Sequence, residues 1–143
     1  MTTPSAASVW IRLAKCYGVT LRSVRQIPMR GGLTLPQFDV LAQLLRHPDG
    51  MTSKELSREL LVTAGNVTGL ITRLQAHGLV ERNAHPVDRR AVLLELSPSG
   101  RRLICAEMKS HEQELDKIFK RVTAKERARL NASLDLFRSA LES

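Results

Sequence analysis

The chain has 143 residues, of which 43 % are hydrophobic and 25 % are charged, a composition that excludes a disordered tail protein and suits one domain with its own core. Lysine and arginine number 22 against 14 aspartate and glutamate residues, so the net charge of +8 favours a polyanionic partner. The sequence has neither an apolar run of membrane-spanning length nor the pattern of a secretory signal, so we expect a cytoplasmic protein without membrane contact.

The N-terminal part of the chain predicts two helices. Apolar residues recur at helical spacing from Ala6 to Val24, and Pro28 with a following glycine pair ends this helix. In the sequence Thr34-Leu-Pro-Gln37, the threonine and glutamine side chains can each accept a hydrogen bond from the other residue's free amide, which is the capping box of a helix start. A second helix therefore follows Thr34.

A helix-turn-helix is predicted next. The capping box Thr52-Ser-Lys-Glu55 starts a short helix, and Thr63 caps a longer one that runs from Ala64 to His77. The apolar residues of the longer helix follow the i, i+3, i+4, i+7 pattern of a helix buried along one stripe: Val67, Leu70, Ile71 and Leu74. Its opposite face is small and uncharged: Gly65, Gly69, Thr72 and Ala76.

Such a low, uncharged face indicates that another molecule approaches the longer helix closely. The major groove of B-DNA admits an α-helix, and asparagine, threonine and arginine side chains match the donors and acceptors of base edges there. The shorter helix would begin near the phosphates. The candidate DNA-binding residues of this motif are Asn66, Thr68, Thr72 and Arg73 for the bases, with Ser53, Lys54 and Thr63 at the two helix starts.

Two strand-like runs, Leu79–Asn83 and Ala91–Leu96, predict a hairpin after this helix, with one short bridge from Met51. The turn-rich tip between the strands, His85–Arg90, ends in two arginines. Because a narrow minor groove concentrates negative potential and attracts arginine, we interpret the hairpin as the wing of a winged helix-turn-helix. We expect Asp88 to pair with a nearby guanidinium and fix its direction. The candidate wing residues are Asp88, Arg89 and Arg90.

The C-terminal part predicts two more helices. Ser97-Pro98 starts a long helix, and the capping box Thr123-Ala-Lys-Glu126 starts the last one. The apolar residues of the last helix lie on one stripe: Leu130, Leu134, Phe137 and Leu141. These stripes exceed what a lobe of this size must bury, so we expect a two-fold dimer interface, in which the same patch serves both subunits. The alternative is a three-helix pack within one chain.

The segments LVTAGNVTGLITRLQAHGLVER and HPVDRRAVLLELSPSGR resemble the MarR family of bacterial transcriptional regulators, and Asp88 and Arg90 match the family's Asp-x-Arg wing motif. The resemblance is strongest from Leu35 to Arg102. The family's wing often begins Asp-Pro, whereas this sequence has His85-Pro86.

This resemblance implies a fold that is mainly α with a small β-wing. Residues 34–97 would form the winged helix-turn-helix DNA-binding lobe of a single domain, 1–143, and residues 6–33 and 98–143 would supply the helices of a dimer platform. The expected partners are a second copy of the chain and double-stranded DNA with a pseudo-palindromic site. The resemblance also implies that a small molecule or a redox signal releases the DNA.

Two sites for such a signal are considered. Trp10, Tyr17 and Phe38 are expected at the hinge between platform and lobe, where they form an effector pocket, with an aromatic acid as the ligand class; plain core packing is the alternative. Cys16 is the redox candidate, but it falls close to the apolar stripe of the first helix, and a sensor thiol must be exposed. We therefore expect Cys16 and Cys105 to be reduced and packed in apolar faces.

The sequence thus predicts a sequence-specific DNA-binding regulator, most simply a repressor that blocks polymerase. The alternative of another class is a winged-helix module that binds protein and not DNA. Neither a metal site nor a cofactor is expected, because the cysteines and histidines lack zinc-site spacing. An enzyme is not expected either, since no nucleophile, base and electrophile converge, and Ser97-Pro-Ser-Gly100 lacks the pattern of a nucleophile elbow.

Overall fold

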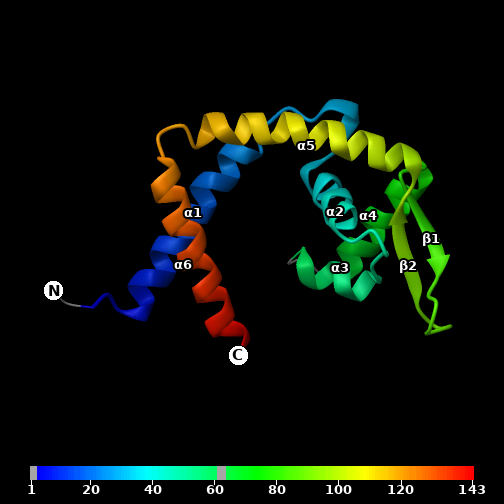
Figure 1. Ribbon diagram of the computed structural model, residues 1–143, viewed down its shortest axis with the longest axis horizontal. Helices are drawn as coiled ribbons and strands as arrows, with labels where there is room; N and C mark the ends of the chain where they lie inside the picture. Colours follow the sequence, from blue (N-terminus) through cyan, green and yellow to red (C-terminus); the bar gives the residue numbers. More distant parts are fainter. Residues whose placement is uncertain (1–2, 61–63) are drawn as a thin grey trace. The chain divides into compact units, whose positions relative to one another are not determined.

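Helices dominate the computed structural model, which describes residues 3–60 and 64–143, and one antiparallel hairpin interrupts them (Figure 1). The elements are α1 (Ala6–Val24), a 3-10 turn (Arg30–Gly32), α2 (Leu35–Arg46), α3 (Ser53–Glu59), α4 (Ala64–Ala76), β1 (Val80–Ala84), β2 (Val92–Leu96), α5 (Pro98–Ile118) and α6 (Ala124–Glu142). This order confirms the predicted mainly helical fold with a small wing. Thr63, the predicted cap of α4, lies outside the described residues.

Capping boxes start three of the helices, as predicted for Thr34, Thr52 and Thr123. At the start of α3 the Thr52 amide donates to Glu55 Oε2 over 2.7 Å, and the Glu55 amide donates to Thr52 Oγ1 over 3.3 Å. The hydrogen bonds from the Thr52 amide and then from its hydroxyl lower the pKa of the Glu55 carboxyl, because they stabilise its charged form.

The core lies where α2, α3 and α4 meet one another and the two strands of the wing. Val67, Ile71 and Leu74 of α4 are fully buried, and they belong to one cluster with Leu41 of α2 and Leu56 of α3. At about 25 cal/mol per Å² of apolar surface, this burial is the main stabilising contribution to the lobe. It holds α4 by one face and leaves the opposite face exposed.

Helix α4 ends in a Schellman motif. Gly78 has a φ of 68°, its amide donates to the Gln75 carbonyl over 2.9 Å, and the Leu79 amide reaches back to the Leu74 carbonyl over 2.9 Å. Because Leu79 is bound to the helix end, β1 begins at Val80, one residue later than predicted. The turn fixes the direction in which the wing leaves the helix.

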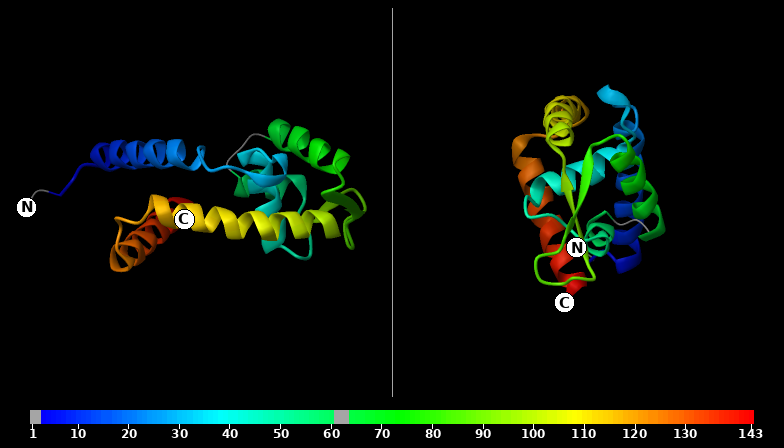
Figure 2. Two further views of the ribbon diagram at one scale, coloured as in Figure 1. Left: turned by 90° about the horizontal axis from the view of Figure 1, so that it is seen from above. Right: turned by 90° about the vertical axis from the view of Figure 1, so that its right-hand side faces the viewer.

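The wing is a two-stranded antiparallel sheet in which Val80 pairs with Leu96 and Ala84 pairs with Val92 (Figure 2). Met51 adds the predicted bridge to Leu94, with N···O distances of 3.0 and 2.8 Å. This bridge joins the segment before α3 to β2, so the wing is held beside the helix-turn-helix.

Ser97 joins the end of α4 to the start of α5. Its hydroxyl donates to the Gly78 carbonyl over 2.6 Å and accepts from the Gly100 amide over 2.9 Å, which makes it the predicted cap of α5. The backbone approaches closely here: a Cβ on Gly100 would lie 2.0 Å from the Leu79 carbonyl oxygen. The junction of α4, wing and α5 is therefore closely packed around Gly100.

The chain divides into two compact units, residues 1–111 and 112–143. In the second unit α6 is tied to the end of α5 by an ion pair between Arg127 and Asp116, whose atoms lie 3.4 Å apart. Neither α1 nor α6 contains a buried residue. Within the described part of the chain, every helix is too short or too polar to cross a membrane.

Both cysteines are exposed, so the prediction that Cys16 and Cys105 pack in apolar faces is wrong. For Cys16 the reason is that no residue of α1 is buried among the described parts of the chain: Trp10 and Tyr17 on the same helix are also exposed. Periodicity identifies an apolar face but does not say what covers it.

Candidate nucleic-acid interface

The outer face of α4 is exposed. The exposed residues of this face are Asn66, Thr68, Gly69, Thr72, Arg73 and Ala76. A Cβ on Gly69 would meet no heavy atom within 4 Å, so the helix backbone itself is accessible there. The Thr72 hydroxyl donates to the Thr68 carbonyl over 2.9 Å, which leaves its oxygen as an acceptor for an approaching donor. The predicted exposure is confirmed for Gly69, Thr72 and Ala76, whereas the exposure of Gly65 lies outside what is described.

Ser53 and Lys54, the predicted phosphate contacts, are exposed in the first turn of α3. The core fixes the direction of α3 through Leu56, which is fully buried one turn later. The two side chains are thus carried by a short helix that packs against α4. Their contact with phosphate stays a prediction.

The wing tip is held by two side chains. The Arg90 amide donates to Asp88 Oδ1 over 2.9 Å, and the Ala91 amide donates to the Asp88 carbonyl over 3.1 Å. His85 Nδ1 lies 3.1 Å from the Val87 amide and 3.0 Å from the Asp88 amide. The tip is therefore a hydrogen-bonded turn, although every residue from 86 to 90 is exposed.

The predicted pairing of Asp88 with a guanidinium is not found among the described residues, whose ion pairs do not include Asp88. An aspartate two residues before an amide closes an Asx turn, and this local bond to Arg90 uses the carboxylate. Asp88 therefore shapes the turn that carries Arg89 and Arg90. Both arginines are exposed at the tip, as predicted.

One further arginine was missed by the sequence analysis. Arg82 of β1 is exposed, and its Nε donates to Gln75 Oε1 of α4 over 2.7 Å. Next to it, the Asn83 amide group donates to the Glu95 carboxylate across the two strands. No local pattern indicates these pairs, because each joins residues of different elements. The bond from Arg82 attaches the wing to α4, and the bond from Asn83 joins the two strands of the wing.

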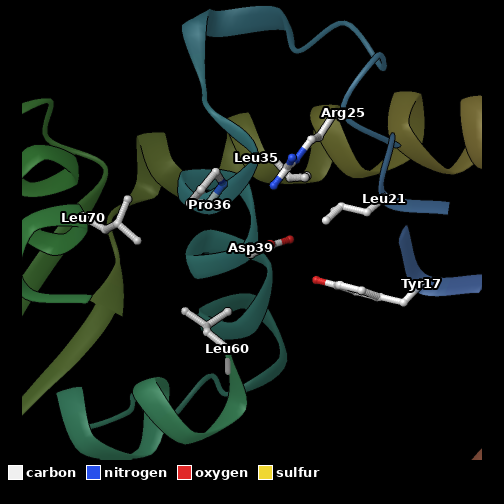
Figure 3. Close-up of a pocket in the computed structure, with 8 residues that line it drawn as sticks. All are labelled: Tyr17, Leu21, Arg25, Leu35, Pro36, Asp39, Leu60 and Leu70. Atoms are coloured by element: carbon white, nitrogen blue, oxygen red, sulfur yellow. The ribbon is translucent and has the colours of Figure 1, made fainter. Parts of the chain in front are cut away.

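A pocket of about 290 Å³ lies between α1, α2 and the helix-turn-helix (Figure 3). Its lining residues are Tyr17, Leu21, Arg25, Leu35, Pro36, Asp39, Leu60 and Leu70. In Figure 3 the Tyr17 hydroxyl, the Arg25 guanidinium and the Asp39 carboxyl point toward the space between α1 and α2. Desolvation raises the pKa of the Asp39 carboxyl, and the positive charge of Arg46 opposes this shift.

Of the three aromatic residues predicted to line an effector pocket, only Tyr17 lines the pocket described above, and its contact with an effector stays a prediction. Phe38 is 6 % exposed in the core, and its ring centroid lies 4.6 Å from that of His111 on α5. Trp10 is 66 % exposed and lies two turns earlier on α1. Successive residues of a helix point about 100° apart, so Phe38 faces the core while its neighbour Asp39 faces the pocket.

A buried carboxylate on α5 also escaped the sequence analysis. Glu107 is 3 % exposed, and its Oε2 accepts from the Arg30 amide over 3.0 Å, which caps the turn between α1 and α2. One turn later, desolvation lowers the pKa of His111, with Glu107 opposing this shift. Two residues that are 77 positions apart give no sequence signal of such a contact.

Known proteins share both this sequence pattern and this fold. Residues 31–91 match the model of the MarR family. The HTH-type transcriptional regulator YsmB of Bacillus subtilis is 36 % identical over 110 residues, which cover 77 % of this chain and 75 % of that protein. The solved structure of BpsR from Bordetella bronchiseptica is 28 % identical, with a TM-score of 0.77 over 91 % of this chain and 98 % of that chain.

AbsC, a MarR family transcriptional regulator from Streptomyces coelicolor, has the same fold, with a TM-score of 0.80 over 99 % of both chains at 17 % identity. These relatives are transcriptional regulators and not enzymes, as the sequence predicts. The sequence match, the helix-turn-helix and the two-stranded wing lead to one assignment: the chain belongs to the MarR family of winged helix-turn-helix DNA-binding transcriptional regulators.

Proposed function

We propose that the protein is a homodimeric repressor that binds a roughly two-fold symmetric duplex site in the cytoplasm and leaves it when a small effector binds. The observation that carries this proposal is the outer face of α4, which combines an open glycine with exposed Asn66, Thr72 and Arg73 on a helix fixed by its buried face. Hydrogen-bonding side chains on a low helix surface suit the major groove. Steric exclusion of polymerase then gives repression.

The proposed dimer rests on apolar faces that the single chain leaves uncovered. No residue of α1 or α6 is buried, although α6 carries an apolar stripe that includes Leu134 and Phe137, which are 42 % and 40 % exposed. Exposed apolar faces of this kind mark association surfaces. We therefore assign residues 6–33 and 98–143 to the dimer platform and residues 34–97 to the DNA-binding lobe of one domain, 1–143, in preference to a three-helix pack within one chain.

In this arrangement the two α4 helices read successive major-groove faces, which repeat at about 34–36 Å along the duplex. Asn66, Thr68, Thr72 and Arg73 contact bases, and Ser53 and Lys54 contact phosphates. The wing places Arg89 and Arg90 at the adjacent minor groove, where a narrow groove attracts arginine.

The first test is the salt dependence of duplex binding. Because phosphate neutralisation releases counterions, the affinity should fall by at least about tenfold between roughly 50 and 200 mM salt. Arg90→Ala should lower the affinity about tenfold at fixed salt, through loss of a charge-assisted contact. Both changes can be measured by fluorescence anisotropy with labelled duplexes.

Arg121→Ala is the matched control for Arg90→Ala, since it removes the same charge from an exposed position between α5 and α6. The control should bind as the wild type does. A protein that binds no duplex even at low salt would instead be the winged-helix protein-interaction module.

For the effector we propose a small aromatic acid that enters the pocket beside Tyr17. The cation of Arg25 suits a carboxylate, and Asp39 suits a hydroxyl or N–H donor on the opposite side of the ligand. BpsR, a relative with the same fold, is regulated in its DNA binding by 6-hydroxynicotinic acid, which carries groups of both kinds. Because Leu60 and Leu70 of the helix-turn-helix also line the pocket, a ligand there favours one position of the lobe.

A titration of the DNA-bound protein with 6-hydroxynicotinate tests this site. The compound should release the duplex from the wild type, and Arg25→Ala should require at least about tenfold more of it at unchanged DNA affinity. Arg22→Ala is the matched control, since it removes the same charge one turn away on α1 but does not line the pocket.

An Arg25→Ala variant that responds as the wild type does would place the effector elsewhere. Release by peroxide that Cys16→Ser abolishes would establish the alternative, a redox-sensing regulator, for which the exposure of Cys16 supplies the accessible thiol.

A further inference from the structure

His85 is the first residue of the wing tip, and its ring holds the backbone of the tip through two hydrogen bonds. Its Nδ1 lies 3.1 Å from the Val87 amide nitrogen and 3.0 Å from the Asp88 amide nitrogen. A backbone amide can only donate, so Nδ1 must offer its lone pair to both amides. The ring in this conformation is therefore neutral, with its proton on Nε2.

Among the described residues, His85 Nδ1 is the one acceptor for the Val87 and Asp88 amides. The other side-chain acceptor at the tip is the Asp88 carboxylate, whose Oδ1 accepts from the Arg90 amide over 2.9 Å. The backbone of the tip is thus closed by one imidazole at its start and one carboxylate at its end. Arg89 and Arg90 follow directly, so their direction depends on both acceptors.

The charged groups around His85 come from the tip itself and from the first turn of α3. Asp88, Arg89 and Arg90 lie on the tip, and Glu55 at the start of α3 is near enough for the charge of His85 to lower its pKa. That shift comes first from the hydrogen bonds of Thr52, and His47 contributes as well. In the described structure none of these groups accepts from the Val87 amide, whose hydrogen bond goes to His85 Nδ1.

We propose that neutral His85 is a positioning residue for the wing arginines and that protonation of its ring releases the tip, so that acidification weakens DNA binding. The proposal rests on the proposed DNA-binding function of the wing. Histidine is the side chain that ordinarily changes its charge between about pH 5 and 8. The sign is fixed by the geometry, because the protonated ring carries a hydrogen on Nδ1 and loses both hydrogen bonds to the tip.

A competing effect has the opposite sign. A protonated His85 adds one positive charge near the phosphates and would strengthen binding by simple attraction. Salt weakens that attraction, because charges are screened over about 8 Å at physiological ionic strength. The two hydrogen bonds, in contrast, fix the backbone that carries the arginines directly. We expect positioning to dominate and the wild-type affinity for duplex to fall about tenfold between pH 8 and pH 5.5.

Three full-length proteins separate positioning from charge when duplex affinity is measured from pH 8 to pH 5.5 at constant ionic strength. His85→Asn keeps an acceptor oxygen that does not titrate, so it should bind as the wild type at pH 8 and show a flat profile. His85→Ala has no acceptor and should bind about tenfold more weakly at every pH. His77→Asn is the matched control: its Nδ1 lies 2.7 Å from the Arg73 carbonyl on α4, and this variant should keep the wild-type pH profile.

The exchange of backbone amide hydrogens supplies a readout that needs no DNA. In the free wild type, the opening equilibrium of the Val87 and Asp88 amides should shift about tenfold toward the open state between pH 8 and pH 5.5, after correction for the intrinsic pH dependence of exchange. In His85→Asn it should stay constant. If the two profiles coincide, or if wild-type binding strengthens on acidification, the proposal is wrong. A wild type that binds no duplex at pH 8 would instead refute the proposed function, and the exchange experiment would still decide the role of His85.

Discussion

Replacement of Gly69 by leucine should lower the affinity for a specific duplex by about a hundredfold or more while the protein stays folded. The open space around Gly69 means that the new side chain projects into solvent in the free protein, without a clash. In the complex the same side chain would occupy the gap between α4 and the base edges. Loss of base contacts costs about 1–3 kcal/mol in each half-site, and a dimer loses them twice.

Fluorescence anisotropy gives the affinity of this variant, and circular dichroism on heating gives its stability. Gly69→Ala is the matched control with minimal bulk: it should stabilise α4 by up to about 1 kcal/mol and lower DNA affinity far less than leucine does. Wild-type affinity in Gly69→Leu would show that the outer face of α4 does not approach DNA closely.

The second large effect concerns stability. Gly100→Ala should lower the free energy of unfolding by about 3 kcal/mol, the upper end of what overpacking costs. The added Cβ would lie 2.0 Å from the carbonyl oxygen and 2.9 Å from the carbonyl carbon of Leu79, and backbone atoms cannot rotate away as a side chain can. The same Leu79 oxygen accepts from the Ser97 amide over 3.1 Å, so a shift would disturb the joint between wing and α5.

Gly18→Ala is the matched control for this prediction, since a Cβ there meets only the end of the Arg22 side chain, at 3.9 Å. It should leave stability unchanged or raise it by up to about 1 kcal/mol through helix propensity. Urea unfolding followed by circular dichroism measures both variants. Equal midpoints for Gly100→Ala and the wild type would mean that the close approach of Leu79 does not exclude a side chain at this position.

The parts of the fold that were predictable depend on signals within a few residues. The capping boxes at Thr34, Thr52 and Thr123 act over three positions, and the Schellman end of α4 is carried by Gly78. The stripe that includes Val67 follows the helical period, so its burial was also predictable. Local chemistry therefore predicted these helix starts, the buried face of α4 and the existence of the wing.

The parts that were not predictable depend on which elements meet. Phe38 and Asp39 are neighbours, yet one enters the core and the other lines the pocket, because the position of α1 is not encoded near them. The bond from Arg82 to Gln75 and the bond from the Arg30 amide to Glu107 join distant residues. Asp88 is a different case, because its partner is only two residues away. Its carboxylate accepts from the backbone amide of Arg90 and not from a guanidinium.

The most direct test of the central claim, that α4 reads DNA bases, is selection of duplexes from a random pool by the purified wild type and by Gly69→Leu. For the wild type the account predicts enrichment of two inverted half-sites whose centres lie about 10 base pairs, or a multiple of that, apart. The pool selected by Gly69→Leu should remain close to the input. Enrichment of the same site by both proteins would contradict the account, and so would the absence of any enriched sequence with the wild type.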